Sequence, residues 1–199
     1  SGYSMNKADR TRQYSVEKTA ALFNMKGYAG TSLSDITQAT GLTKGSIYGN
    51  FANKDEVALA AFECNLSKLE EIVHQEMLGE RSNKNKLLAY VRVYSNCMRP
   101  PFPEGGCPIL NTATEADDTH PLLKAGASAA LVNWKNKIAG LVRSGIANHE
   151  FKDTVDPARF ALSIIAMIEG GIMISRLTGN ANYRKLIAGA VEELILSLE

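Results

Sequence analysis

The segment between residues 43 and 50 combines lysine, asparagine, tyrosine and small hydroxyl side chains, which are types that bind nucleic acid. Lysine suits the acceptors of guanine and asparagine suits adenine, so Lys44, Ser46 and Asn50 are candidates for base edges in the major groove. Hydroxyl and ammonium groups suit phosphate oxygens. The candidates for phosphate contacts are Thr31, Ser32, Lys44, Tyr48 and Lys54. Thr43 and Gly45 complete the set of residues expected to contact DNA.

Two short helices joined by a tight turn must position these side chains, and the sequence predicts such a helix-turn-helix from about Ser32 to Phe51. Ser32 and Asp35 form the Ser-x-x-acid start of the first helix. Gly41 ends that helix because glycine tolerates a positive φ, and Thr43 caps the second helix. The apolar residues expected to hold these helices together are Ile36, Leu42, Ile47 and Phe51.

The second helix of this motif contains two glycines, Gly45 and Gly49. Each lowers helix propensity by about 1 kcal/mol. A helix this weak indicates close approach to a partner surface. A plain helical hairpin with a glycine turn explains the same pattern, so a helical protein-interaction module is the alternative interpretation.

The charge distribution favours a polyanionic partner for the N-terminal segment only. Through Lys54 there are seven basic and three acidic residues, a net charge of +4. The remainder has 15 basic and 18 acidic residues, a net charge of −3. We expect Lys7, Arg10 and Arg12 to follow the DNA backbone or its minor groove, so that affinity falls steeply with salt.

The rest of the chain also predicts helices, because apolar residues recur at steps of three and four and strand patterns are nearly absent. Gly27 is expected to end a first helix over residues 7–26, in which Val16, Ala20 and Phe23 face inward. Asn53 caps a long helix that begins at Lys54. The further helices are expected at about 54–79, 83–98, 109–116, 119–148 and 157–179, followed by a final helix through Leu198. Asp118 or Thr119 is expected to cap the helix that contains Pro121 in its first turn.

The last two helices are too apolar for one small core to cover. Residues 158–174 are apolar nearly all round, but this run is shorter than the roughly 20 apolar residues of a spanning helix. We therefore expect no membrane segment. A second copy of the chain is the simplest cover, through a two-fold interface. The expected interface residues are Phe160, Ile164, Ile168, Ile187, Val191 and Leu194.

The segment around the motif resembles the N-terminal domain of the TetR/AcrR family of bacterial regulators. The resemblance covers roughly residues 15–60 and depends on these pieces: Leu22-Phe23, Gly27-Tyr28, Thr31-Ser32, Asp35-Ile36, Gly41 through Tyr48, Phe51 and Lys54-Asp55. This chain departs from the family at Ser15, where a large aliphatic residue is usual, and at Thr19, Thr37 and Thr40, where alanine is usual. The resemblance implies a two-fold dimer built mostly from the last two helices. It also implies a ligand pocket in the C-terminal body, whose occupancy weakens DNA binding.

The C-terminal body offers a mostly apolar set of pocket candidates with two polar anchors, Asn111 and Glu115, one helical turn apart. The expected pocket residues are Phe62, Met98, Ile109, Asn111, Glu115, Trp134, Ile138 and Met167. Two alternatives remain open: a redox-responsive regulator using Cys107 with Cys97, and a metal-responsive one using Asp117, Asp118 and His120 with Glu115. Helix capping by these acids and burial of the thiols explain the same residues more simply.

The sequence thus predicts an all-α protein with an N-terminal three-helix helix-turn-helix domain, residues 5–53, and a C-terminal helical bundle for ligand binding and dimerisation, residues 54–199. No nucleophile elbow, phosphate loop, dinucleotide fingerprint or zinc-protease motif occurs, so an enzyme is not expected. Neither is a cofactor or a metal. Three cysteines, an odd number, favour a reduced cytoplasm. We expect a repressor released from double-stranded operator DNA by a small-molecule effector.

Overall fold

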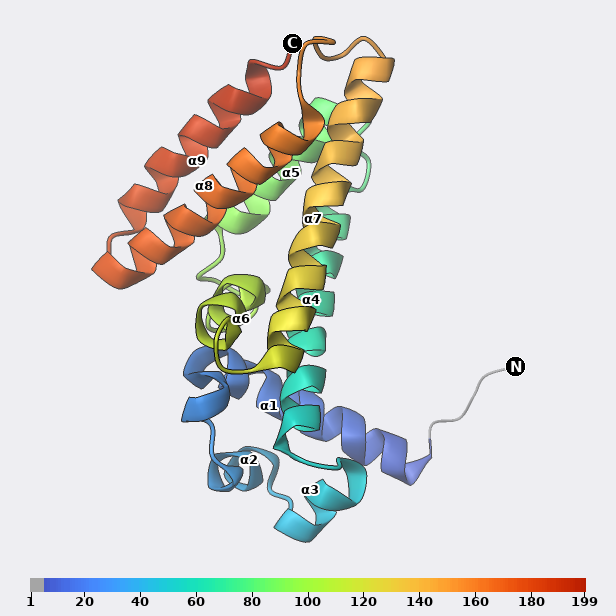
Figure 1. Ribbon diagram of the computed structural model, residues 1–199, viewed down its shortest axis with the longest axis vertical. Coiled ribbons are helices and arrows are strands. Elements are labelled where there is room, and N and C mark those ends of the chain that lie inside the picture. The colour runs from blue at the N-terminus through green and yellow to red at the C-terminus, as the bar shows by residue number, and fades with distance from the viewer. Residues whose placement is uncertain (1–5) are drawn as a thin grey trace. The chain divides into compact units, whose positions relative to one another are not determined.

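The computed structural model describes residues 6–199, and over this part of the chain it contains nine helices and no strand (Figure 1). The helices are α1 (Lys7–Gly30), α2 (Leu33–Thr40), α3 (Lys44–Asn50), α4 (Lys54–Met77), α5 (Asn83–Ser95), α6 (Pro108–Ala116), α7 (Pro121–Ala147), α8 (Pro157–Thr178) and α9 (Ala181–Leu196). The predicted all-α class is confirmed. The chain divides into two units: residues up to Lys68 with Pro103–Ala127 form the first, and Leu69–Phe102 with Ser128–Glu199 form the second.

The first helix is longer than the sequence predicts. It starts at a capping box, in which the Asp9 amide donates to Asn6 Oδ1 over 2.9 Å. Gly27 was expected to end it, but α1 continues to Gly30. At Gly27 the backbone has φ +74° and ψ 176°, which breaks the helical geometry at that one residue. The glycine therefore interrupts the helix, and one short turn follows it.

The helix-turn-helix has the predicted bounds. Ser32 caps α2, because its Oγ accepts the Asp35 amide over 3.0 Å. Thr43 caps α3, because its Oγ1 accepts the Ser46 amide over 3.1 Å. Between the two helices, Gly41 has a φ of +68°, the left-handed conformation that glycine adopts without a steric cost.

One apolar cluster holds α1, α2, α3 and the start of α4 together within the first unit. It contains all the inward-facing residues that the sequence predicts for these helices, with Val16 and Leu42 at its partly buried edge. The buried members are Ala20, Phe23, Ile36, Ile47, Phe51, Val57, Ala58 and Ala61. The short α3 therefore depends on packing for its position, since its own helix propensity is low.

Three of the hydroxyl residues that depart from the family pattern are buried. Ser15, Thr19 and Thr40 donate to the backbone carbonyls four residues earlier, at 2.8, 2.7 and 2.8 Å respectively. A buried hydroxyl with a hydrogen-bond partner avoids most of its desolvation cost. These substitutions are thus compatible with the tightly packed cluster.

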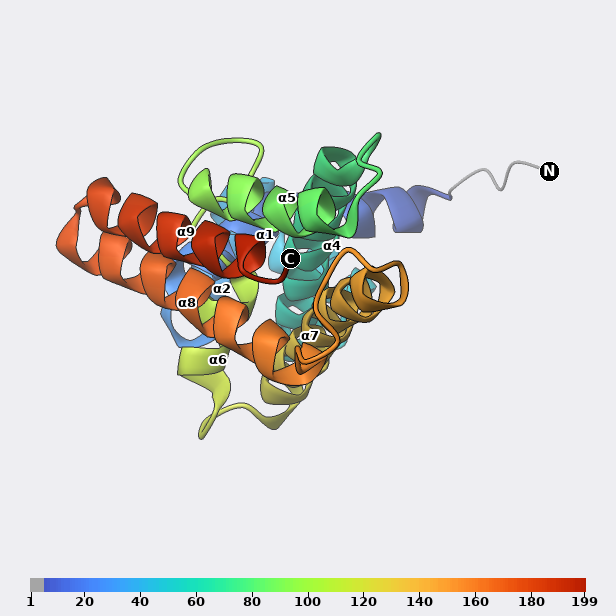
Figure 2. The same ribbon diagram turned by 90° about the horizontal axis from the view of Figure 1, so that it is seen from above.

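In the second unit, α5, α8 and α9 lie side by side (Figure 2). The aromatic part of this unit centres on Trp134, the single tryptophan of the chain. Its buried indole stacks on Tyr94 with ring centroids 4.8 Å apart, and Phe102 meets Tyr94 edge-on at 5.6 Å.

The helix α8 is 22 residues long, and an 18-residue stretch of it has a mean hydropathy of 1.7, so by length and composition it could cross a membrane. Core helices of globular proteins pass the same test. Here Ile164, Ile168 and Ile172 are buried and α8 packs along α9, so packing accounts for the apolar residues on one side of the helix.

The expected dimer-interface set is wrong in part. Ile164, Ile168 and Val191 are buried within the protomer, because this side of α8 and α9 packs on neighbouring helices of the same chain. Phe160 and Ile187 are half-buried, and Leu194 alone of the set is exposed. The periodicity correctly identified two apolar helices. The interface prediction, however, took residues mainly from the side that faces the protomer's own core.

A different side of each helix remains uncovered. On α8 the residues at steps of three and four along this side are Leu162, Ala166, Gly170, Met173 and Leu177. On α9 they are Tyr183, Leu186, Ala190 and Leu194. We call these two rows the α8 stripe and the α9 stripe. Leu177 is 84% exposed and Leu186 is 63% exposed, large values for leucine.

Candidate nucleic-acid interface

The outward side of α3 presents most of the side chains predicted to contact DNA. Ile47 faces the core and is buried, whereas Lys44, Gly45 and Tyr48 are exposed. Thr43 is exposed and Ser46 is half-buried. A helix anchored on one side by an isoleucine thus shows a row of short polar groups, a lysine and a tyrosine on the other.

Asn50 is oriented differently from the expectation. Its Nδ2 donates to the Ser46 carbonyl over 2.9 Å, so the amide folds back on α3. A bidentate contact to adenine needs the amide nitrogen and oxygen together. The amide nitrogen has a second hydrogen, but the bond to Ser46 directs the amide along α3, so a bidentate contact with a base requires the side chain to turn outward.

Two predicted phosphate contacts also have internal roles. Thr31 is buried and its Oγ1 donates to the Gly27 carbonyl over 2.6 Å, so a phosphate cannot reach its hydroxyl and its place in the contact set was wrong. Lys54 is half-buried, and its Nζ donates to the Tyr28 carbonyl over 2.6 Å while it lies over the Tyr28 ring. Ser32, by contrast, is exposed as expected.

The start of α2 is held by hydrogen bonds to the Asp35 carboxylate. The carboxylate of Asp35 accepts the Ser32 amide over 2.8 Å and the Lys26 ammonium over 3.0 Å. These bonds lower the pKa of Asp35 to about 2, with the Ser32 amide the larger cause. Because the folded-state pKa is depressed, this contribution to stability is present near neutral pH and is lost only as the pH falls toward that value.

Arg12, expected to follow the DNA, instead holds the C-terminal end of α3. Its guanidinium donates to the Asn50 carbonyl over 2.6 Å, pairs with Glu56 at 2.8 Å and lies 4.3 Å from the centroid of the Phe51 ring. Glu56 in turn accepts the Ala52 amide over 2.6 Å. A cation at the C-terminus of a helix also interacts favourably with its dipole. Lys7 and Arg10 remain exposed.

We expect Arg12→Ala to weaken DNA binding about fivefold while changing the free energy of unfolding by no more than about 1 kcal/mol, because half-exposed ion pairs stabilise little. Titration of labelled duplex and thermal unfolding measure the two effects. The matched control is Lys18→Ala, which removes an exposed cation from the same helix that is not among the expected DNA contacts and does not hold α3. Greater loss of duplex affinity in the control than in Arg12→Ala would contradict a positioning role.

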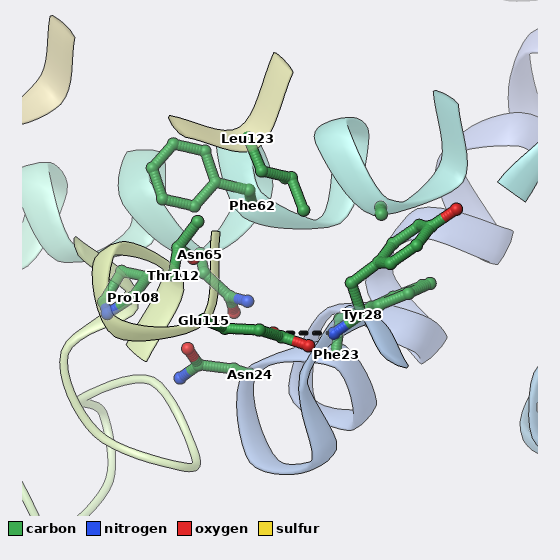
Figure 3. A pocket seen from close by; sticks show the side chains of 10 residues that line it. Phe23, Asn24, Tyr28, Phe62, Asn65, Pro108, Thr112, Glu115 and Leu123 are labelled. Atoms are coloured by element: carbon green, nitrogen blue, oxygen red, sulfur yellow. Dashed lines mark hydrogen bonds between the residues drawn. The ribbon is translucent and has the colours of Figure 1, made fainter. Parts of the chain in front are cut away.

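A second group of polar residues surrounds the break in α1. Here the carboxylate of Glu115 accepts the amides of Tyr28 and Ala29, over 2.9 and 2.8 Å. A small cavity of about 20 Å³ lies beside this contact (Figure 3). It has room for about one water molecule. Its lining residues are Phe23, Asn24, Tyr28, Ala58, Phe62, Asn65, Pro108, Thr112, Glu115 and Leu123.

The predicted ligand-pocket residues therefore fall into two groups. Phe62 and Glu115 line the cavity of the first unit, where Ile109 is buried and Asn111 Nδ2 donates to the Asn24 carbonyl over 3.1 Å. The members in the second unit are Met98, which is exposed, Met167, which is half-buried, and the buried Trp134 and Ile138. Met98 is 54% exposed and lines neither this cavity nor a closed pocket in this conformation, so its place in the effector site stays a prediction.

Sequence reasoning missed Asn24 and Asn65. Asn65 is buried and donates to the Ala20 carbonyl over 2.8 Å, and Asn24 donates to the carbonyls of Glu104 and Gly106 over 2.7 and 2.9 Å. Both are polar residues on otherwise apolar helix sides. This break in the apolar pattern was the feature of the sequence that could have identified them.

Among the residues considered for a metal, His120 has a structural role as a helix cap. His120, rather than Asp118 or Thr119, caps α7, because its Nδ1 accepts the Leu123 amide over 3.2 Å. The other ring nitrogen, Nε2, lies 3.3 Å from Asp55 Oδ1. Asp117 and Asp118 are exposed, and residues 6–199 contain no cluster of three or more potential ligands arranged to hold a metal.

Tyr28 joins the same network through its hydroxyl, which donates to Asp55. That hydrogen bond to a carboxylate, with burial, raises the pKa of Tyr28 to about 12, and it lowers the pKa of Asp55. The His120 and Tyr28 rings form a T-shaped pair with centroids 4.5 Å apart. The network ties the last turn of α1 to α4 and to the start of α7 within the first unit.

Both thiols of the proposed redox pair are buried. Burial raises the pKa of Cys97 and disfavours the thiolate, which is the reactive form. The redox alternative gains no support from this environment.

Comparison with known proteins gives consistent matches along most of the chain. The family described as "Bacterial regulatory proteins, tetR family" matches residues 16–61, and "Tetracyclin repressor-like, C-terminal domain" matches residues 84–191. The HTH-type transcriptional regulator YxaF of Bacillus subtilis is 25% identical, covering 93% of this chain and 95% of its own. The HTH-type transcriptional repressor ComR of Escherichia coli is 29% identical over 52% of this chain and 50% of its own. A solved TetR-family regulator from Cytophaga hutchinsonii is 43% identical with a TM-score of 0.93, covering 99% of this chain and 98% of that one.

Proposed function

This chain belongs to the tetR family of bacterial regulatory proteins, and we propose that it is a homodimeric repressor that leaves its operator when a small-molecule effector binds. The observation that best supports DNA binding is α3, a core-anchored helix with Lys44, Gly45 and Tyr48 on its open side. The proposed contacts are Ser32, Thr43, Lys44, Gly45, Ser46 and Tyr48, with Asn50 and Lys54 available after local rearrangement. Repression is the activity named for the relative ComR.

The α8 and α9 stripes support the homodimer. Several large apolar side chains lie exposed on two adjacent helices, and contiguous patches of this kind mark interaction surfaces. The middle of the α8 stripe consists of the small residues Ala166 and Gly170, so the backbone of a second helix can approach closely there. A two-fold axis would bury both stripes in each copy and place two α3 helices for two half-sites.

The effector is proposed to bind in the C-terminal part, in line with a division into a DNA-binding domain of residues 5–53 and a ligand-binding and dimerisation domain of residues 54–199. The cavity beside Glu115 is too small for an organic molecule in this conformation. Effector binding therefore requires the site to open. We place the protein in the cytoplasm, where operator DNA is found and where thiols stay reduced.

Salt dependence of DNA binding tests this proposal. Three exposed cations, Lys7, Arg10 and Lys44, give six in a dimer. Neutralising six phosphates lowers affinity about 1000-fold between 50 and 200 mM salt. The measurement is a mobility-shift titration on the duplex upstream of the protein's own gene, with a shuffled duplex of equal composition as control. A protein-interaction module would leave both duplexes unshifted at the lowest salt, and that outcome would refute the proposal.

A further inference from the structure

The last turn of α1 leads directly into the cap of α2, so its position determines where the helix-turn-helix begins. Gly27 breaks α1 with a φ of +74°, and the two amides after the break belong to Tyr28 and Ala29. Only Thr31 and Ser32 separate this turn from α2. A displacement of the turn would therefore move α2, and with it α3, which packs on the same apolar cluster.

A single carboxylate on α6 binds both amides of this turn. Glu115 Oε2 accepts the Tyr28 amide (Figure 3), and Oε1 accepts the Ala29 amide. Charge-assisted hydrogen bonds to backbone amides are among the stronger ones in proteins. A Cβ at residue 27 would lie 2.8 Å from the Cδ of this carboxylate, so the glycine leaves the space that the contact needs.

The carbonyl side of the turn is fixed independently. The Gly27 carbonyl accepts the Thr31 hydroxyl and the Tyr28 carbonyl accepts the Lys54 ammonium, each over 2.6 Å. With the amides bound to α6 and a carbonyl bound to α4, the turn has a defined position relative to both helices.

Glu115 is itself held in place. On the same side of α6, one turn earlier, Asn111 donates to the carbonyls of Asn24 and Gly105 over 3.1 and 2.8 Å. The loop before α6 accepts two hydrogen bonds from the Asn24 side chain. The α6 segment thus contacts α1 over more than one turn, and the carboxylate needs no rearrangement to reach the amides.

We propose that Glu115 is a positioning residue for DNA binding: it caps the broken end of α1 and so sets the orientation in which α2 and α3 meet the duplex. This inference rests on the proposed function. It assigns Glu115 a role on the DNA-binding side of the molecule in place of the ligand anchor that the sequence indicated.

The test is a graded series in the full-length protein. The probe is one duplex selected from a random-sequence pool by the wild-type protein. Glu115→Gln keeps one acceptor oxygen and Glu115→Ala keeps none. We expect affinity to fall about tenfold and about 100-fold, respectively, because DNA binding must then order the released turn in each protomer. Asp118→Asn removes an equal charge from an exposed position close by and is expected to bind within about twofold of the wild type.

Amide hydrogen exchange separates positioning from general destabilisation. In both Glu115 variants the amides of Tyr28 and Ala29 should exchange at least about tenfold faster, while the core amides of Ile36 and Ile47 keep their rates. A variant that merely unfolds more often would speed all of these amides together.

Two outcomes would overturn the proposal. One is wild-type affinity in a folded, dimeric Glu115→Ala protein, and the other is unchanged exchange at Tyr28 and Ala29. If the wild-type protein selects no duplex at all, the proposed function fails instead, and the exchange rates still decide whether Glu115 caps the turn.

Discussion

Leu186→Asp is expected to convert the proposed dimer to folded monomers and to remove high-affinity DNA binding. Leu186 is the most exposed large residue of the α9 stripe, so the substitution leaves the protomer core intact. Burying a leucine at an interface contributes about 2 kcal/mol. In a two-fold dimer the loss occurs twice, which weakens dimerisation by at least about 1000-fold. Sedimentation velocity measures the association, and a duplex titration measures the loss of paired half-site binding.

The matched control is Leu122→Asp on α7, where the leucine is 55% exposed. It introduces the same charge on an equally open surface outside the two stripes, and it should remain dimeric. Val191→Asp provides the opposite control, because that side chain is buried in the protomer and its replacement should unfold the second unit. If Leu186→Asp sediments as the wild type does, the second copy does not use the α9 stripe.

Tyr48→Ala is expected to lower duplex affinity about 100-fold with no change in dimerisation or thermal stability. The side chain is 38% exposed on the open side of α3, so its removal leaves no cavity in the core. A hydrogen bond to a charged phosphate contributes about 1.5 kcal/mol, and each dimer would lose two of them. Fluorescence anisotropy with labelled duplex measures the affinity, and sedimentation confirms the assembly state.

Two further variants test whether the Tyr48 hydroxyl binds DNA and whether the effect is specific to α3. Tyr48→Phe retains the ring and should lose most of the affinity if the hydroxyl binds phosphate. Tyr14→Ala removes a tyrosine of similar exposure from α1 and should bind normally. Equal losses in the Tyr48→Ala and Tyr14→Ala variants would mean that α3 has no special relation to the duplex.

Local signals were sufficient to predict the helix-turn-helix. Ser32, Gly41 and Thr43 each fix a helix boundary through backbone chemistry that depends on the adjacent residues only, so a reader of the sequence can place α2 and α3 correctly. The inward residues followed from periodicity in the same way. The longer α1 was missed because Gly27 has the conformation of a helix stop, while the turn after it is completed by a residue 87 positions away.

The errors concern side chains whose role depends on distant partners. Periodicity shows that α8 and α9 have apolar sides, but only the tertiary packing, in which α5 lies along α9, shows which side is covered within the protomer. Arg12 and Lys54 have the types expected of DNA contacts, yet carbonyls far along the chain bind them first. Glu115 was identified as a functional anchor, but the group that it binds could not be read from spacing.

The stacked pair of Trp134 and Tyr94 has a practical consequence for solution work. Because the chain has one tryptophan, its emission is an intrinsic optical reporter of the second unit, with no contribution from a tryptophan elsewhere. Unfolding of α1 to α3 alone would therefore leave the tryptophan emission unchanged. The same event would still lower the helical signal in far-ultraviolet circular dichroism. The two spectroscopic probes together resolve whether the halves of the polypeptide melt cooperatively or in succession.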